Sequence, residues 1–326
     1  MKVVIQPELF TPPVNHLALI EVFNHAETGR HRVEIDRDHP DVAEWLRQQS
    51  PGLQEEIRFA LDVSTDAEPL EPARTVITIG RFHASDWLAS PQRLTLSDAR
   101  AVLNRPFTVL LEHDRTDRDF LLCMLSEEER EFFKSRERAG FLRVEKGGGL
   151  EDMEKRLTKV TADSVSAHLW WVLFDSDALQ PGKPSASSNK VKARCHRILH
   201  HQLTRRFSES YITDVALHGW ATGVASAKTR QMRLDRLRAF RRMSTAQRHH
   251  FNMKEGFAKD RERVGENAGS LYYDLTEEDR STLQHGFELN IKKLFADGSV
   301  TEADLRRDGG WHELRPAICE LMEMLR

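Results

Sequence analysis

The stretch that most constrains the fold is an unbroken apolar run, Leu169 to Phe174, followed directly by Asp175-Ser176-Asp177. The run is short and rich in aromatic side chains, so it predicts a strand buried on both faces of a parallel sheet. Ligands of open α/β sheets bind at the carboxyl ends of the strands. Two acids two residues apart on an extended chain point the same way, which indicates a site for Mg²⁺ or Mn²⁺. A polar turn that merely ends the strand is the alternative.

Length and composition narrow the class of protein. A chain of 326 residues predicts two domains, or one domain with large appendages. With 39% hydrophobic and 30% charged residues, the chain is typical of a soluble protein with a sizeable core. No apolar run approaches about 18 residues and the N-terminus lacks the features of a secretory signal, so no membrane association is expected. Three widely spaced cysteines favour the reducing cytoplasm over disulfides.

Residues 1–92 predict a separate α+β accessory domain. Short strands are expected at Val3–Ile5, Arg32–Ile35 and Thr75–Gly80, and helices at Asp41–Gln48 and Leu53–Leu61. The acidic, proline-containing segment Ser64–Ala73 predicts a surface loop. Because no catalytic pattern occurs here, the domain is interpreted as a scaffold or a docking module for a partner.

Residues 93–212 predict an α/β catalytic core. Strands are expected at 107–111, 140–144 and 169–174, with helices between them, and this alternation predicts a parallel sheet with right-handed crossovers. Glu112 ends the first of these strands, and Asp117 follows it in a helix for which Thr116 is the expected N-cap. Gly147–Gly149 fit neither a Walker loop nor a Rossmann fingerprint and predict a tight turn beside the acidic strand ends.

The segments LLEHDRTDRDFL and VLFDSDA together resemble the Toprim domain of topoisomerases, primases and nucleases. That family places a Glu after its first strand and a DxD after its third, which are the positions of Glu112, Asp175 and Asp177. The chain looks most like the OLD-type (overcoming lysogenization defect) nucleases of phage defence, over roughly residues 105–260. Within that resemblance, Thr116-Asp117 resembles an acid-S/T-acid turn, and Glu209 and Lys254 take the positions of a conserved acid and lysine. The resemblance implies a Toprim-like sheet and a nuclease activity.

Phosphodiester cleavage gives these residues a chemical role. Two metal ions about 4 Å apart can activate water and stabilise the leaving oxygen. The expected metal ligands are Glu112, Asp117, Asp175, Asp177 and Glu209. Lys254 is the candidate for neutralising charge on the scissile phosphate, so the catalytic set is Glu112, Asp175, Asp177 and Lys254. The alternatives are an ion pair of Glu209 with Arg205 or Arg206, and a solvated helix end for Lys254.

Residues 213–326 predict a helical region with a basic surface. Positive charge is concentrated between Ser226 and Arg242, a density suited to a phosphate backbone. The expected nucleic-acid contacts are Arg205, Arg206, Lys228, Arg230, Arg233, Arg236 and Arg241. Upstream, Gln180–Asn189 predicts a flexible loop. A zinc site is considered at Cys195, His196 and His200, but no fourth ligand is evident.

These observations predict a cytoplasmic, Mg²⁺- or Mn²⁺-dependent Toprim endonuclease acting on DNA or RNA. The resemblance implies an effector of anti-phage defence. Because this chain shows no ATPase segment, a separate ATPase or sensor protein is the expected partner, and a homo-oligomer is left open. Two alternatives stand: a non-catalytic nucleic-acid-binding or regulatory subunit with a structural acidic cluster, and a Toprim primase or nucleotidyl transferase. A DxD phosphatase is disfavoured because Leu179 stands where such enzymes need Thr.

Overall fold

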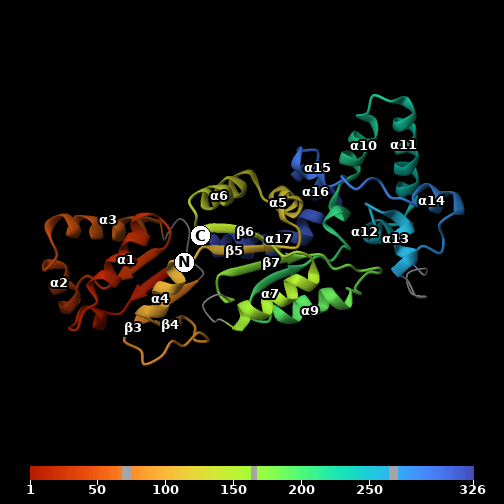
Figure 1. Ribbon diagram of the computed structural model, residues 1–326. Helices are drawn as coiled ribbons and strands as arrows, with labels where there is room; N and C mark the ends of the chain where they lie inside the picture. The colour runs from red at the N-terminus through yellow and green to blue at the C-terminus, as the bar shows by residue number, and fades with distance from the viewer. Residues whose placement is uncertain (68–74, 163–166, 264–270) are drawn as a thin grey trace.

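The computed structural model of the chain describes residues 1–67, 75–162, 167–263 and 271–326. Two parallel sheets lie side by side, and a helical region extends beyond the second of them (Figure 1). The chain is therefore an α/β protein with helices flanking both sheets. Within the described residues, no helix combines the length and the apolar character needed to cross a membrane.

The N-terminal unit is a four-stranded parallel sheet, which corrects the prediction of an α+β domain. The strand order is β2-β1-β3-β4, and every neighbouring pair is parallel. Its elements are β1 (Lys2–Ile5), η1 (Pro7–Phe10), α1 (His16–Glu27), β2 (Arg32–Ile35), α2 (Pro40–Arg47), α3 (Pro51–Ala67), β3 (Val76–Gly80), β4 (Gln92–Thr95) and α4 (Leu96–Leu103). The first three strands and α2 match the predictions, and α3 is longer than predicted. Helix α1 and strand β4 were not predicted.

Two predicted boundaries in this unit are wrong. Because β4 pairs with β3, the first sheet continues beyond residue 92, and the division between the two sheets falls after α4. The predicted loop Ser64–Ala73 begins as helix, since α3 runs to Ala67; residues 68–73 of that loop lie outside the described residues. Ser64 fixes this helical turn to the sheet, because its Oγ accepts the Val33 amide at 3.0 Å.

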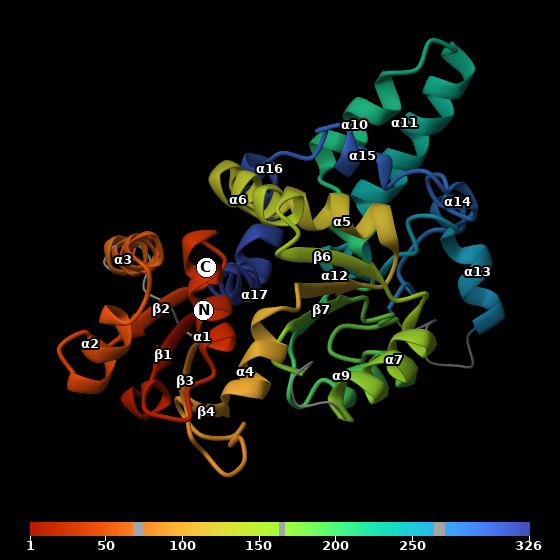
Figure 2. The same ribbon diagram turned by 60° about the vertical axis from the view of Figure 1, so that its left-hand side comes forward.

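The central sheet repeats the same parallel arrangement, with the order β6-β5-β7-β8. Its elements are β5 (Phe107–Leu111), α5 (Asp114–Cys123), α6 (Glu127–Arg138), β6 (Leu142–Lys146), α7 (Leu150–Ala162), β7 (Trp170–Phe174), α9 (Ala186–Arg194) and β8 (Leu199–Gln202). Helices α5 and α6 cover one face and α7 and α9 the other (Figure 2). The predicted strands and their parallel pairing are confirmed, and β8 is a fourth strand that the sequence did not reveal.

The two central strands are buried on both faces, as their apolar runs predict. Every residue of β5 and β7 is buried. Val109 and Trp171 point into a core shared with the C-terminal helices, whereas Leu110 and Val172 point into a core shared with the N-terminal unit. Because side chains alternate along a strand, the central sheet connects the two hydrophobic cores, and its carboxyl edge is held rigidly.

The regular secondary structure of the described C-terminal residues is all helical, as predicted, with turns between the helices. It contains η2 (Ser208–Tyr211), α10 (Asp214–Thr222), α11 (Ala227–Arg242), α12 (Thr245–His250), α13 (Gly256–Arg263), α14 (Glu277–Thr282), α15 (Lys293–Ala296), α16 (Glu302–Asp308) and α17 (Gly310–Leu325). Helices α10 and α11 form a hairpin that projects from the body in both views (Figures 1 and 2). Between Phe287 and Phe295 the only helical residues are those at the start of α15.

Candidate metal centre at the edge of the central sheet

Glu112 and Asp175 meet where the chain reverses its direction across the central sheet. From β5 the chain passes to β6 on one side and then back to β7 on the other, so the crevice between β5 and β7 is the topological switch point at which such sheets bind ligands. The Asp175 amide donates to Glu112 Oε2 at 3.3 Å. Both side chains are buried, with 8% and 6% exposed. Two acidic strand ends about sixty residues apart along the chain are thus joined by a hydrogen bond.

Asp177 lies at this edge in a backbone conformation that differs from the predicted extended one. The strand ends at Phe174, and Asp177 has a left-handed backbone with φ of 51°, so the alternation expected of an extended chain does not apply. Its amide donates to the Arg206 carbonyl at 3.0 Å. The Asp177 carboxylate nevertheless acts electrostatically on Glu112. The turn therefore keeps both aspartates at the edge by a special backbone conformation.

The predicted flexible loop 180–189 helps to hold this turn. Its last part is the first turn of α9, where Ser188 is fully buried and donates from Oγ to the Asp175 carbonyl at 2.7 Å. The Ser185 amide donates to the Ser176 carbonyl at 2.9 Å. These bonds make the second half of the loop part of the scaffold, which corrects the prediction of a flexible segment there.

The glycine turn closes the other side of Glu112, as predicted. The amides of Gly147 and Gly148 donate to the carbonyls of Leu111 and Glu112 at 2.6 and 3.1 Å. A Cβ at Gly147 would lie 3.0 Å from the Leu111 carbonyl oxygen and closer still to Met153. Only glycine lets the backbone approach the strand end this closely.

Asp117 lies in the first turns of α5 and points back to the edge. Its Oδ2 accepts the His113 amide at 2.7 Å, and its Oδ1 accepts Ser208 Oγ at 3.3 Å. The helix begins at Asp114 with His113 in the N-cap position, so the expected N-cap at Thr116 is wrong. Asp117 caps the helix from within its first turns, because its carboxylate accepts the free backbone amide of His113.

Glu209 and Lys254 lie at the same edge, and a second lysine joins them. Glu209 is 1% exposed and forms ion pairs with Lys254 and with Lys292, the latter at 3.5 Å. The Lys292 ammonium also lies 2.8 Å from Asp117 Oδ1. The alternative pairing of Glu209 with an arginine does not occur among the described residues, because Arg205 and Arg206 pair with Asp308, Glu313 and Asp260.

Lys292 was not predicted from the sequence. The segment around it has the pattern of an ordinary amphipathic helix, with Ile291, Leu294 and Phe295 buried. The only signal is a lysine that falls on the apolar side of this pattern, three residues before Phe295. A lysine there is buried by necessity, and a buried ammonium requires an acidic partner.

The two lysines are positioned by a close contact between two backbone segments. Gly256 follows Lys254, and Gly286 precedes Lys292; both have a positive φ. A Cβ on Gly256 would lie 2.1 Å from the Leu283 carbonyl oxygen, and one on Gly286 would lie 2.6 Å from the Met253 carbonyl oxygen. The segments therefore pack backbone against backbone, and a larger residue at either position would displace the lysines from the edge.

The carboxylates at this edge carry more negative charge than the lysines neutralise. Burial raises the pKa of Glu112 to about 7, with further contributions from Asp177 and Asp117. Burial and the Glu112 carboxylate also raise the pKa of Asp175 well above its usual range. The pKa of Lys254 is lowered by burial and by the Lys292 ammonium, whereas that of Lys292 is raised by Asp117 and Asp175 despite its burial.

A hard divalent cation fits the chemistry of these side chains, because carboxylate oxygens are its usual ligands. Burial disfavours the ionised forms of Glu112 and Asp175, and a bound cation would favour them. The fit is incomplete in one respect: within the described parts of the chain, no group of three or more His, Cys, Asp or Glu side chains converges to hold a metal ion. Asp117 and Glu209 are instead drawn toward the lysines. The same finding gives no support to a zinc site at Cys195, His196 and His200.

The predicted nucleic-acid contacts fall into two groups. Arg205 and Arg206 are 3% and 1% exposed, and Arg206 forms a bidentate ion pair with Asp260 at 2.7 and 2.8 Å. Their guanidinium groups are thus unavailable to a phosphate backbone, which corrects the prediction for these two residues. The remaining predicted contacts lie along α11, where they are exposed or half-buried: Lys228, Arg230, Arg233, Arg236 and Arg241.

Three of the α11 arginines hold the helix against neighbouring segments. Arg233 bonds Glu288 at 2.8 Å and lies 4.3 Å from the centre of the Trp220 ring. Arg236 donates to the Phe287 carbonyl at 2.9 Å, and Arg241 pairs with Asp214 at 2.7 Å. Lys228 and Arg230, at the tip, are exposed. The tip of the hairpin is therefore the part of this surface best placed to meet another molecule.

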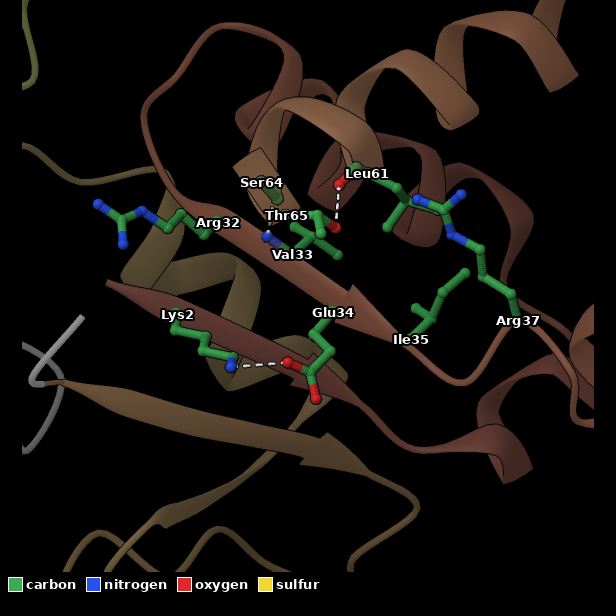
Figure 3. A pocket seen from close by; sticks show the side chains of 9 residues that line it. All are labelled: Lys2, Arg32, Val33, Glu34, Ile35, Arg37, Leu61, Ser64 and Thr65. Atoms are coloured by element: carbon green, nitrogen blue, oxygen red, sulfur yellow. Dashed lines mark hydrogen bonds and ion pairs between the residues drawn. The ribbon is translucent and has the colours of Figure 1, made fainter. Parts of the chain in front are cut away.

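The cavities of the N-terminal unit lie away from the acidic edge, which is the carboxyl edge of the central sheet with Glu112, Asp117, Asp175, Asp177 and Glu209. One of about 150 Å³ lies between β2 and α3, with Lys2 and Glu34 at its rim joined by an ion pair of 2.6 Å (Figure 3). Its wall is formed by Val33, Leu61 and Ser64, and Thr65 Oγ donates to the Leu61 carbonyl at 2.8 Å. These polar groups bond one another, and the cavity has no cluster of acids like that at the central sheet.

No protein-family model, no curated protein and no solved structure matches this chain. The assignment of a function therefore depends on the geometry and chemistry of the acidic edge.

Proposed function

We propose that the protein is a metal-dependent nuclease that hydrolyses phosphodiester bonds of DNA or RNA at the carboxyl edge of the central sheet. The observation that supports this most directly is the contact between Glu112 and Asp175 at the switch point between β5 and β7. A structural salt cluster would pair each acid with a base, whereas Glu112 Oε2 accepts the backbone amide of Asp175, and neither carboxylate has a lysine or arginine nitrogen within 4 Å among the described residues. The resemblance to Toprim nucleases supports the same assignment.

The chain's own residues have distinct tasks in this proposal. Glu112, Asp175 and Asp177 would hold a Mg²⁺ or Mn²⁺ ion, which supplies Lewis acidity and lowers the pKa of bound water. Lys254, whose side chain is 32% exposed, is the cation best placed to approach a scissile phosphate. Asp117 and Glu209 position the lysines. The Ser208 amide, which donates to Asp175 Oδ1 at 3.0 Å, fixes the orientation of that carboxylate.

The substrate would reach the edge along the C-terminal region. Lys228 and Arg230 at the tip of the α10–α11 hairpin offer positive charge to a phosphate backbone. The resemblance further suggests an effector of anti-phage defence under the control of a separate ATPase or sensor protein. The N-terminal unit, whose described strand ends carry no buried acids, is the candidate surface for that partner.

Cleavage by the purified whole chain tests the proposal. Plasmid DNA and tRNA are incubated with Mg²⁺, with Mn²⁺ or with a chelator, and the products are resolved on gels. We expect cleavage that requires the metal and that falls at least about 10²-fold in Asp175→Asn. Glu131→Gln, an exposed acid of α6, is the matched control and should cleave as the wild type does. Equal cleavage by Asp175→Asn would rule out the proposed site.

A non-catalytic nucleic-acid-binding subunit is the second candidate. The observation that favours it is the pairing of Asp117 and Glu209 with lysines, which partly neutralises the cluster without any metal. This candidate predicts binding of nucleic acid without cleavage, even with the products of neighbouring genes present. It also predicts that Asp175→Asn leaves the binding unchanged.

A further inference from the structure

Lys292 has no role in the chemistry proposed above, yet it is the most deeply placed cation at the acidic edge. Its side chain is 4% exposed, and its ammonium lies 2.8 Å from Asp117 Oδ1 and 3.5 Å from Glu209 Oε1. Burying an ammonium costs several kcal/mol unless carboxylates surround it closely. Two carboxylates therefore fix this cation between them.

The acids of the edge divide into two groups by their cations. Asp117 and Glu209 share the Lys292 ammonium, and Glu209 also binds Lys254. Glu112 and Asp175 contact each other, and neither has a lysine or arginine nitrogen within 4 Å among the described residues. The first group already contains its cation, whereas the second group does not.

We propose that the edge binds one divalent cation, on Glu112 and Asp175, and that the Lys292 ammonium replaces the second metal ion of a two-metal nuclease. This inference rests on the proposed function and replaces the expectation of a two-ion site. An ammonium and a metal ion cannot occupy the space between Asp117 and Glu209 together, because both bind the same carboxylate oxygens. The ammonium supplies one positive charge there instead of two.

The packing around Lys292 keeps the ammonium in place. Three residues later, Phe295 packs its ring edge-on against Phe120 of α5, with 5.2 Å between ring centres. Cys123 of the same helix donates from Sγ to the Phe295 carbonyl at 3.3 Å. Because α5 also carries Asp117, the lysine and its partner are parts of one packed unit. A metal ion could enter only by displacing a buried charge whose carboxylate partners, among the described residues, are Asp117 and Glu209.

The number of Mn²⁺ ions bound per chain tests this inference without any assay of cleavage. Free Mn²⁺ is measured by electron paramagnetic resonance while the metal is titrated into the whole protein. We expect one Mn²⁺ per wild-type chain and two per Lys292→Ala chain, because the substitution vacates the space between two carboxylates. Lys292→Arg retains the charge and should bind one. Lys254→Ala is the matched control: it removes the more exposed lysine, and the protein should still bind one.

The outcomes separate this inference from the proposed function. Two ions per wild-type chain, or one per folded Lys292→Ala chain, would overturn the inference and leave a metal-dependent nuclease standing. No binding by the wild type, with Asp175→Asn indistinguishable from it, would overturn both. Circular dichroism shows whether Lys292→Ala folds. If it does not, the counts for the wild type and for Lys292→Arg decide the question.

Discussion

The two sheets of this protein have the same topology, but among the described residues only the central sheet has buried acids directly after its strands. In each, the first strand lies between the second and the third, and the fourth follows the third at the edge, with all strands parallel. The switch point of the central sheet is lined by Glu112 and Asp175. The corresponding position after β1 of the N-terminal sheet is Gln6, whose amide continues the ladder to the Ile79 carbonyl at 2.9 Å.

The N-terminal switch point is closed by its own chain. Arg81 follows β3 and donates to the carbonyls of Thr11 and Pro13, the latter at 3.1 Å. The ring of Phe82 lies over Gly80, where an added Cβ would be only 2.8 Å away, and Arg93 lies over the other part of that ring. The comparison shows that the arrangement of strands provides a crevice, whereas the side chains after the strands decide whether it becomes a site.

The largest expected difference between the sheets lies after their fourth strands. Arg206 follows β8 and pairs with buried Asp260, so Arg206→Met would leave that carboxylate without a partner and cost about 3–5 kcal/mol of unfolding free energy. Thr95, the last residue of β4, caps α4 with its side chain, and Thr95→Ala should cost about 1 kcal/mol. Urea denaturation measures both. Similar losses would mean that the C-terminal region does not stabilise the central sheet through this pair.

The next effect concerns cleavage. Glu112→Gln removes a charge from the central switch point and should lower the cleavage rate by about 10²–10³-fold. Gln6→Ala alters the matched position of the N-terminal sheet and should leave the rate unchanged. Initial rates on one DNA or RNA substrate under saturating Mg²⁺ give both numbers. A loss of cleavage in Gln6→Ala would show that the N-terminal unit contributes to the site.

The sequence predicted the parts of this comparison that local pattern determines. The apolar runs 107–111 and 169–174 can only be buried strands, and their parallel pairing brings Glu112 and Asp175 together. It did not predict β8, because LHHQ has no apolar run, or the parallel N-terminal sheet, because β4 is short and α1 was missed. Lys292 was beyond reach, since its partners lie 175 and 83 residues away along the chain.

A pH dependence should distinguish the central edge from the N-terminal one. The pKa of Glu112 is raised to about 7 chiefly by burial, so the folded protein binds more protons than the unfolded chain between the ordinary glutamate pKa and 7. The unfolding free energy of the metal-free protein should therefore fall as pH rises through this window. Glu112 contributes at most about 1.4 kcal/mol per unit, and Asp175, whose pKa is also raised by burial, adds to the fall. Urea denaturation across the window measures the slope. Glu112→Gln should reduce the slope, and an unchanged slope would assign the whole effect to Asp175 or to another group.

The smallest effect tests which unit of the molecule meets nucleic acid. Lys228 at the tip of α11 is expected to contact a phosphate, so Lys228→Ala should weaken binding and reduce the slope of log affinity against log salt concentration by about one. Arg47 on α2 is a matched cation of the N-terminal unit, 73% exposed and paired with Glu44, and Arg47→Ala should change neither quantity. Fluorescence anisotropy of a labelled oligonucleotide, at several salt concentrations and without metal, measures both variants. If Arg47→Ala reduces the slope and Lys228→Ala does not, the N-terminal unit binds nucleic acid and the α10–α11 hairpin does not, which is the reverse of the proposal.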